Sequence, residues 1–329
     1  MKSFWLQLPK PVMVLAPLAD VTDAAFRRMI AKYSAHERAD GTVGGPDVFW
    51  TEFVSADGLV RADDAGKQKL LADLIYTDEE RPIVAQLFSS TPAYMEAAAA
   101  CCAERGFDGI DINMGCPDRG IEKQGCGSAM IKDPANARAV IRAAKRGAPN
   151  LPVSVKTRLG YNKDELETWL PELLAEEPAV VTVHARTRKE MSQVPARWER
   201  VMRAVEIRNE QGSDTLIFGN GDVRDIAHAR ALAEETGADG VMLGRAIFGN
   251  PWLFHPEKDL ANVSLSERFA AMVEHTHLFE ELLPHKNFAI MKKHYKAYVN
   301  GFDGAKEFRA ELMEAENADE VERIVAKFI

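Results

Sequence analysis

The sequence predicts a (β/α)8 barrel followed by a small C-terminal helical domain, on three observations. Short β-branched segments alternate with longer amphipathic segments, a pattern typical of parallel strands joined by helices. Eight such strand segments fit within about 250 residues, the usual length of a closed barrel of this kind. Beyond residue 256 only helical periodicity continues. We therefore expect a barrel domain at 1–256 and a helical domain at 257–329.

The predicted strands and helices of the barrel follow one another in order. A doubly wound open sheet would carry a GxGxxG turn after its first strand, whereas this strand ends in APLADVTD, which favours the barrel. The link 55–82 is less regular, with room for a short helix in GKQKLLADLI. The strands are expected at 12–16, 48–54, 83–88, 109–114, 153–159, 180–186, 215–221 and 240–245, and the helices at 22–34, 91–105, 134–147, 164–176, 196–211 and 224–236.

The C-terminal segment reads as amphipathic helices separated by caps and breaks. Helical periodicity covers 265–283, 285–299 and 305–329. The expected caps and breaks between them are Ser264, Pro284, Gly301 and Gly304.

Composition limits the classes of protein to consider. The 329 residues carry a net charge of −9, which argues against nucleic-acid binding over the whole surface. No apolar run approaches the ~20 residues of a membrane helix, and the proline-interrupted N-terminus lacks a signal-peptide core. We expect a cytoplasmic protein, by default a monomer. The ten-residue gap between Cys116 and Cys126 does not match zinc-ligand spacing, so no metal site is predicted.

The loops after strands seven and eight carry a candidate phosphate site. In such barrels the active site lies at the C-terminal ends of the strands, and these two loops frequently bind phosphate. GNGDV (219–223) and LGRA (243–246) are small open turns with exposed backbone. Turn formation alone would explain the glycines of either loop, but their pairing favours a cofactor with one phosphate.

Cationic side chains occupy alternate positions at the ends of strands five and six. Alternate strand residues share one face, so Lys156 projects with Arg158, and His184 projects with Arg186. These groups cannot all be solvated inside a closed barrel. They indicate an anionic or electron-rich ligand, such as a reduced flavin ring together with a polyanionic substrate.

At these strand ends the sequence resembles the tRNA-dihydrouridine synthases. The tail MKKHYKAYVNGFDGAKEFRAEL resembles the C-terminal helical domain of that family. Eight motifs in the right order form a specific signal. They are APLADVTDAAFR, TEFVSADGL, VAQLF, DGIDINMGCPDRGIEKQGCGSAM, VKTRLG, VHARTR, GNGDV and MLGRAIFGNPWLF.

The resemblance implies FMN-dependent reduction of the uridine C5–C6 double bond in tRNA, driven by NADPH or NADH. It also implies roles for individual residues. Carried over by position, Pro17 and Leu18 would pack on the flavin, Gln86 would form a hydrogen bond to its polar edge, and Lys156 with His184 nearby would stabilise the reduced ring. Asn220, Gly221 and Asp222 would hold the ribityl chain, and Gly244 and Arg245 would bind the phosphate. Asn113 and Arg186, with Arg158 as a further candidate, would contact the target uridine.

Cys116 coincides with the family's GCP cysteine and is the candidate general acid. A thiol with a pKa of ~8.5 is mostly protonated at neutral pH and can donate a proton to uracil C5. The alternative is a small buried residue in a turn, the interpretation favoured for Cys126. Leu18 and Ala185 depart from the methionine and glycine usual in the family, and the loop at 34–48 is longer than expected. Preceding strand two, that loop should lie on the barrel face away from the active site.

Segment 285–309 holds a local excess of positive charge that could face RNA. Tyr295 and Tyr298 lie among its cations, as in surfaces that stack bases. A solvated helix face is the alternative. The basic residues are Lys286, Lys292, Lys293, Lys296, Lys306 and Arg309, against Asp303 and Glu307, and Lys292, Lys293 and Lys296 are the candidate tRNA-binding residues.

Two other functions stay open at this stage. The first is an FMN-dependent dehydrogenase or ene-reductase of a small molecule, similar to dihydroorotate dehydrogenase. The second is an RNA-binding barrel without catalytic activity. The position of the target uridine and the choice between NADPH and NADH do not follow from the sequence.

Overall fold

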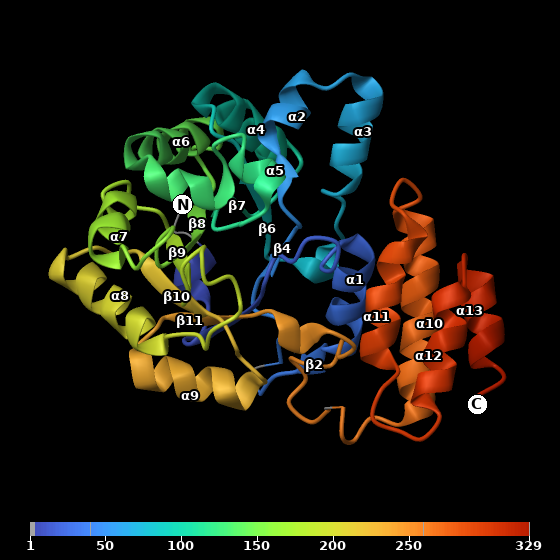
Figure 1. Ribbon diagram of the computed structural model, residues 1–329. Coiled ribbons are helices and arrows are strands. Elements are labelled where there is room, and N and C mark those ends of the chain that lie inside the picture. Colours follow the sequence, from blue (N-terminus) through green and yellow to red (C-terminus); the bar gives the residue numbers. More distant parts are fainter. Residues whose placement is uncertain (1–3, 40, 259, 329) are drawn as a thin grey trace.

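The computed structural model describes residues 4–39, 41–258 and 260–328. Helices surround a ring of strands on one side of the molecule, and the C-terminal helices form a separate group beside α1 (Figure 1). The strands are β1 (Val12–Leu15), β2 (His36–Glu37), β3 (Val43–Gly44), β4 (Phe49–Trp50), β5 (Val54–Ser55), β6 (Ile83–Phe88), β7 (Gly109–Met114), β8 (Val153–Arg158), β9 (Val180–His184), β10 (Leu216–Asn220) and β11 (Gly240–Leu243).

The strands form the predicted parallel barrel. In the described chain they pair in the order β1-β11-β10-β9-β8-β7-β6-β4, with β5 also pairing β6. A parallel bridge between Val14 and Val48 closes the ring. The predicted strand 48–54 is interrupted between Trp50 and Val54, where Gln86 N donates to the Thr51 side-chain oxygen at 3.0 Å. The fold prediction is confirmed, and strand two is split into β4 and β5.

The barrel helices agree with the predicted order, and the irregular link contains more helix than expected. Two α-helices and a 3-10 helix fill 55–82. The helices of the barrel are α1 (Ala24–Tyr33), α2 (Ala56–Arg61), α3 (Asp64–Ala72), η2 (Asp78–Glu80), α4 (Pro92–Glu104), α5 (Arg119–Glu122), η3 (Gly127–Lys132), α6 (Pro134–Gly147), α7 (Leu166–Leu174), α8 (Trp198–Glu210), α9 (Ile226–Thr236) and η4 (Arg245–Ile247).

The barrel interior changes from apolar to polar along its axis. At the N-terminal ends of the strands, Trp5 of η1 (Phe4–Gln7) packs against Phe218 and Trp50, with ring centroids 5.6 and 5.7 Å apart. The middle of the barrel holds buried polar residues, including Asp111 and Ser154. The apolar layer therefore closes one end, and polar side chains are directed to the other.

The C-terminal helices pack against the barrel through α1. Phe26 of α1 stacks on His275 with ring centroids 4.7 Å apart, and its ring also contacts His294 at 5.0 Å. No helix within the described ranges is long and apolar enough to cross a membrane. The elements of this group are α10 (Leu265–Leu282), η5 (Phe288–Ile290), α11 (Met291–Tyr298), α12 (Ala305–Glu314) and α13 (Ala318–Val325).

Candidate functional site

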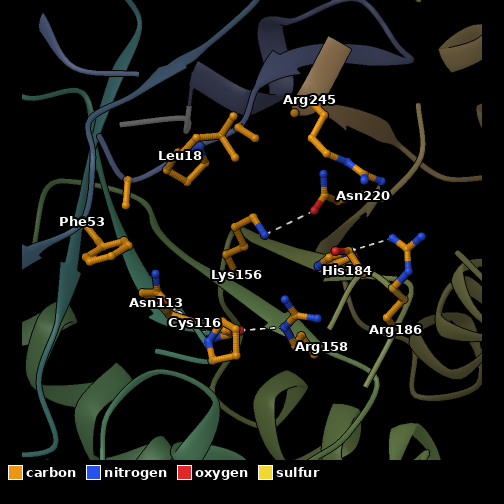
Figure 2. A pocket seen from close by; sticks show the side chains of 18 of the residues that line it. Leu18, Phe53, Asn113, Cys116, Lys156, Arg158, His184, Arg186, Asn220 and Arg245 are labelled. Atoms are coloured by element: carbon orange, nitrogen blue, oxygen red, sulfur yellow. Dashed lines mark hydrogen bonds between the residues drawn. The ribbon is translucent and has the colours of Figure 1, made fainter. Parts of the chain in front are cut away.

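A cavity of about 310 Å³ opens at the C-terminal ends of the barrel strands. Leu18 and Phe53 face it from one side, Asn113 from the end of β7, Cys116 from the loop after that strand, and Lys156 projects into its middle (Figure 2). The predicted site residues that line it are Pro17, Leu18, Asn113, Cys116, Lys156, Arg158, His184, Arg186, Asn220, Gly221, Asp222, Gly244 and Arg245.

Lys156 is the central cation of the cavity. Its Nζ donates to Asn220 Oδ1 at 3.3 Å, and the Asn220 amide in turn donates to Met242 O at 2.8 Å. Burial lowers the pKa of Lys156 to about 8, and the charge of Arg158 adds to this effect. No carboxylate lies within ion-pair distance of Lys156 among the described residues. The side chain is thus suited to an anionic or electron-rich group in the cavity.

The loop after β10 has two consecutive residues with positive φ angles. Gly221 has φ +126°, and a Cβ there would lie 2.9 Å from the Ala196 Cβ. Asp222 follows with φ 54°, a conformation uncommon outside glycine. Its carboxylate accepts from Ala196 N at 2.8 Å. The loop is therefore held in a strained form where it faces the cavity, as at many functional sites.

Asp222 bridges two arginines on the cavity wall. Its two carboxylate oxygens accept from Arg186 and Arg245. Partial burial opposes ionisation, but these ion pairs, chiefly the bond from Arg186, lower the pKa of Asp222 overall. The predicted phosphate residue Arg245 therefore pairs with Asp222 here, although 63% of its side-chain surface remains exposed.

His184 is neutral in this setting. Burial lowers the pKa of His184 well below its usual value, and the charges of Arg158, Lys156 and Arg186 lower it further. The Arg186 guanidinium lies 3.2 Å from His184 Nε2 and also donates to Val194 O at 2.6 Å. Arg186 is buried with its donors engaged, so its predicted contact with uridine would compete with these bonds.

Arg158 connects two loops beside the cavity. Its Nε donates to Gly115 O at 2.7 Å, and its NH1 donates to Thr187 O and Met191 O. Burial lowers the pKa of Arg158 to about 10. The geometry shows a side chain that holds loop backbone, whereas binding of substrate by Arg158 stays a prediction.

Cys116 faces the cavity from a loop anchored by Asn113. Asn113 Oδ1 accepts from Cys116 N at 2.9 Å and from Gly115 N at 3.1 Å. Burial raises the pKa of the Cys116 thiol, against the hydrogen bond from the Asp118 backbone N–H and the charges of Arg158 and Lys156, and the charge of Asp118 adds to the effect of burial. The thiol is thus protonated at neutral pH. Cys126 is 2% exposed and packs with Phe88 and Ile121, as its structural interpretation requires.

Gln86 lies beneath the cavity, outside its lining. It is fully buried, its Nε2 donates to Asp111 Oδ2 at 2.7 Å, and its Oε1 accepts from Asn113 Nδ2 at 3.1 Å. The predicted contact of Gln86 with the polar edge of a flavin has no counterpart in these bonds, which connect it to the protein interior.

A second cavity of about 440 Å³ adjoins the first and shares Phe53 and Cys116 with it. Lys286, which precedes α11, reaches it and donates to Glu52 Oε2 at 2.6 Å, with Asp73 3.1 Å away. Neither Phe53 nor the Lys286–Glu52 pair was predicted. Phe53 lies near the end of the segment 48–54 that was predicted as strand two, so its position could have indicated it. The ion pair carries no sequence signal, because its partners are 234 residues apart.

The helix face predicted to contact RNA is only partly available. Tyr295 and Tyr298 are fully buried, so the prediction that they present aromatic rings to RNA is wrong. Lys286 is withdrawn into its ion pairs. Lys296 is exposed, and Lys292 and Lys293 are partly exposed. The tyrosines face inward because α11 packs against α10 and α1, and their spacing of three residues fits a core stripe equally well.

Further cations lie on the segments after β7, β8 and β9, at the end of the barrel where the cavity opens. Two cations lie over the Tyr161 ring, with Lys132 Nζ 4.4 Å and Arg188 Cζ 5.1 Å from the ring centroid. Arg188 is also paired with Glu122. We call the exposed lysines of these loops the rim lysines; they form no ion pair with any described residue and comprise Lys123, Lys132, Lys163 and Lys189.

The loop predicted at 34–48 forms a short hairpin of β2 and β3. Asp47 near its end accepts from Met13 N at 2.7 Å, which places this part of the loop at the start of β1. None of its residues lines the cavity, in agreement with the expected location; residue 40 lies outside the described residues.

Comparison with known proteins places the whole chain in one family. A family model described as dihydrouridine synthase matches residues 14–329. The probable tRNA-dihydrouridine synthase 2 of Bacillus subtilis (strain 168) is 40% identical, covering 99% of this chain and 97% of the relative. A probable tRNA-dihydrouridine synthase of Staphylococcus epidermidis is 37% identical, covering 99% and 96%. The resemblance inferred from the motifs is confirmed.

Solved structures support the barrel fold alone. Morphinone reductase in complex with tetrahydroNAD has a TM-score of 0.50 at 13% identity, covering 74% of this chain and 85% of that chain. Histamine dehydrogenase from Rhizobium sp. 4-9 has a TM-score of 0.51 at 11% identity, covering 81% and 49%. At these identities the likeness concerns the fold and not the substrate.

Proposed function

The chain belongs to the dihydrouridine synthase family of flavin-dependent oxidoreductases, and from this premise we propose that it reduces uridines in tRNA to dihydrouridine. The proposed cofactor is FMN, and the proposed reductant is NADPH, with NADH as the alternative. The single observation that carries the proposal is that Cys116 and Lys156 share one cavity at the strand ends. A proton donor and a cation for an electron-rich ring are the two groups that this reduction requires.

The residues present fit a flavin with one phosphate. Lys156 offers a cation that pairs with no carboxylate of the described residues, and Pro17 and Leu18 supply an apolar surface at the cavity wall. A Cβ at Gly244 would meet nothing closer than 3.7 Å, so the backbone there is open on the cavity side. Arg245 could exchange its bond with Asp222 for a phosphate. These residues would hold the cofactor, with Asn220 and Gly221 beside its ribityl chain.

The bound flavin would supply a hydride to uracil C6. Negative charge then develops on the uracil, and the Cys116 thiol donates its proton to C5, which completes the addition of two hydrogens across the double bond. Asn113 holds the Cys116 backbone through its side-chain oxygen. Lys156 stabilises negative charge on the electron-rich side of the site, and neutral His184 beside it adds no further cation.

The tRNA would contact two basic surfaces. The rim lysines lie on the segments that follow the strands at the end of the barrel where the cavity opens, and a uridine must leave its stack there to reach Cys116. Lys292, Lys293 and Lys296 form the second surface, on the helical domain proposed at 257–329, next to the catalytic domain proposed at 1–256. Backbone phosphates need positive charge and not base-specific contacts for positioning. Local charge of this kind is compatible with the net charge of −9. We further propose a cytoplasmic monomer.

The purified protein tests this proposal directly. FMN, NADPH and an unmodified tRNA transcript are supplied, and dihydrouridine is measured by mass spectrometry of the digested tRNA. We expect dihydrouridine at one or a few positions. Flavin turnover without dihydrouridine would favour a small-molecule reductase, and failure to retain any flavin would favour a barrel that binds RNA without catalysis.

A further inference from the structure

A chain of hydrogen bonds connects the barrel interior to the backbone of Cys116. Ser154 Oγ donates to Asp111 Oδ1 at 2.5 Å, and Gln86 Nε2 donates to Asp111 Oδ2 at 2.7 Å. Gln86 Oε1 accepts from Asn113 Nδ2 at 3.1 Å, and Asn113 Oδ1 accepts from Cys116 N at 2.9 Å. The chain spans β8, β7 and β6 and ends on the candidate general acid.

The direction of this chain is set at its lower end. An ionised carboxylate has only acceptor oxygens, so Gln86 must present its NH2 group to Asp111. The Gln86 oxygen then faces Asn113 and requires the NH2 group of that residue. Asn113 is left with its oxygen toward Cys116 N, where an acceptor is needed. Each amide can turn over, and the charge of Asp111 selects one of the two orientations.

We propose that Asp111 is a positioning residue for the reaction, whose ionised carboxylate orients the Gln86 and Asn113 amides so that Asn113 anchors the Cys116 loop. The inference rests on the proposed function of Cys116, but the anchoring itself does not. Asp111 is 1% exposed and lies outside the cavity lining, so it touches neither substrate nor cofactor. It acts on Cys116 through two side chains.

Protonation of Asp111 would remove this selection. When the proton is on Oδ2, that oxygen donates, so Gln86 turns its oxygen toward Asp111, Asn113 directs its NH2 group at Cys116 N, and the anchor is lost because two donors face each other. When the proton is on Oδ1, that oxygen donates to Ser154 Oγ, which can turn toward Ile110 O, and the anchored orientation is kept. The neutral form therefore populates both orientations. Burial raises the pKa of Asp111 to about 6, against the bonds from Ser154 and Gln86 and the charge of Lys156. The neighbouring strands present Lys156 as the charged group, with neutral Ser154, Gln86 and Trp50.

The raised pKa of Asp111 determines how the anchoring depends on pH. Only the ionised form selects the anchored orientation, so anchoring is complete above pH 6 and is weakened as the pH falls through about 6. A purely structural role for a buried carboxylate would change stability over the same range, without a specific effect on Cys116. Reactivity of the Cys116 thiol separates the two cases.

The experiment compares alkylation of Cys116 by iodoacetamide in the purified proteins, measured by mass spectrometry of the peptide that contains it. In Asp111→Asn we expect Cys116 to react at least threefold faster than in the wild type at pH 7.5, because a neutral amide accepts either orientation of Gln86 and the loop is anchored only part of the time. The ratio should approach one at pH 5, where Asp111 of the wild type is also protonated. An unchanged rate at pH 7.5 would overturn the proposal.

A double variant that moves the carboxylate from position 111 to position 113 should restore the anchor of the Cys116 loop. In Asp111→Asn/Asn113→Asp the carboxylate stands next to Cys116 and accepts from Cys116 N whatever the orientation of Gln86. We expect alkylation within 1.5-fold of the wild-type rate. The matched control is Asp47→Asn, which removes another buried carboxylate that is not connected to Cys116. Failure of the rescue, or equal acceleration in the control, would count against positioning by Asp111.

Half-reactions connect the positioning to turnover. In Asp111→Asn, reduction of the bound flavin by NADPH should stay within twofold of wild type, whereas reoxidation by tRNA should slow at least tenfold. An equal loss in both half-reactions would indicate a structural role and would overturn the proposal. A wild-type protein that forms no dihydrouridine would contradict the proposed function, and the alkylation comparison would still decide the positioning.

Discussion

Side-chain positions were predicted better at the strand ends of the barrel than in the C-terminal helices. Lys156, Arg158 and His184 were expected to share the barrel interior, and all three line the cavity. Tyr295 and Tyr298 were expected to face RNA, and both are buried. In a closed barrel, the side chains of alternate residues on a strand point into the same interior. A helix can bury any of its faces, and its neighbours decide which one.

The two regions meet at Lys286. This residue belongs to the helical segment but reaches the barrel, where it pairs with Glu52 beside the second cavity. Its charge therefore joins the two regions instead of facing solvent. The comparison teaches that charge counted along a helical segment overestimates the charge available to a polyanion.

The largest expected effect concerns the barrel. In Cys116→Ala, turnover should fall by about 10²- to 10⁴-fold, the usual contribution of a general acid. Flavin content and tRNA affinity should stay near those of the wild type, because in the proposed mechanism the thiol donates a proton and does not hold the flavin or the tRNA in place. Single-turnover formation of dihydrouridine provides the measurement. Cys126→Ala is the matched control in the same loop, and normal turnover in Cys116→Ala would remove the thiol from the mechanism.

The next effect tests the junction between the regions. Lys286→Met leaves Glu52 buried without its partner, which should lower the free energy of unfolding by about 3–5 kcal/mol. Denaturant titration measures the loss. The double variant Lys286→Met/Glu52→Gln removes the uncompensated charge and should recover most of the stability. Equal stability of Lys286→Met and wild type would show that this ion pair does not hold the regions together.

A smaller effect distinguishes the two proposed RNA surfaces. Replacing Lys292, Lys293 and Lys296 by Gln should weaken tRNA binding, and each lost phosphate contact should reduce the slope of log affinity against log salt by about 0.9 or less. Replacing the rim lysines by Gln should act in the same direction. Stability should change by only about 0.5 kcal/mol, because these side chains are solvated. Unchanged salt slopes would assign the RNA contact to another face.

The smallest effect is a pH profile. Burial raises the pKa of Cys116 above that of a free thiol, so its alkylation rate should still rise above pH 9, where an exposed thiol has become mostly thiolate. A small-molecule thiol alkylated in parallel provides the reference. A Cys116 profile that levels off at or below the reference would contradict the shift and would favour a thiolate at neutral pH.

Much of the candidate site was predictable because it depends on short spacings at strand ends. The residues from Asn220 to Asp222, and Gly244 with Arg245, were expected on the cavity and are found there. Asp111 also had a signal that was not used. It stands two residues before Asn113 on the same strand, so it must face the interior of the barrel, where a carboxylate is unusual.

The sequence by itself determined the parallel barrel, the helical domain after it, the family and the side chains that enter the cavity, because these follow from periodicity and from motifs of a few residues. Only the tertiary structure decided the pairing of Lys286 with Glu52, the burial of Tyr295 and Tyr298, and the chain of bonds from Asp111 to Cys116. Each of these depends on contacts between different elements, and the register and packing that create such contacts are not encoded in any local pattern.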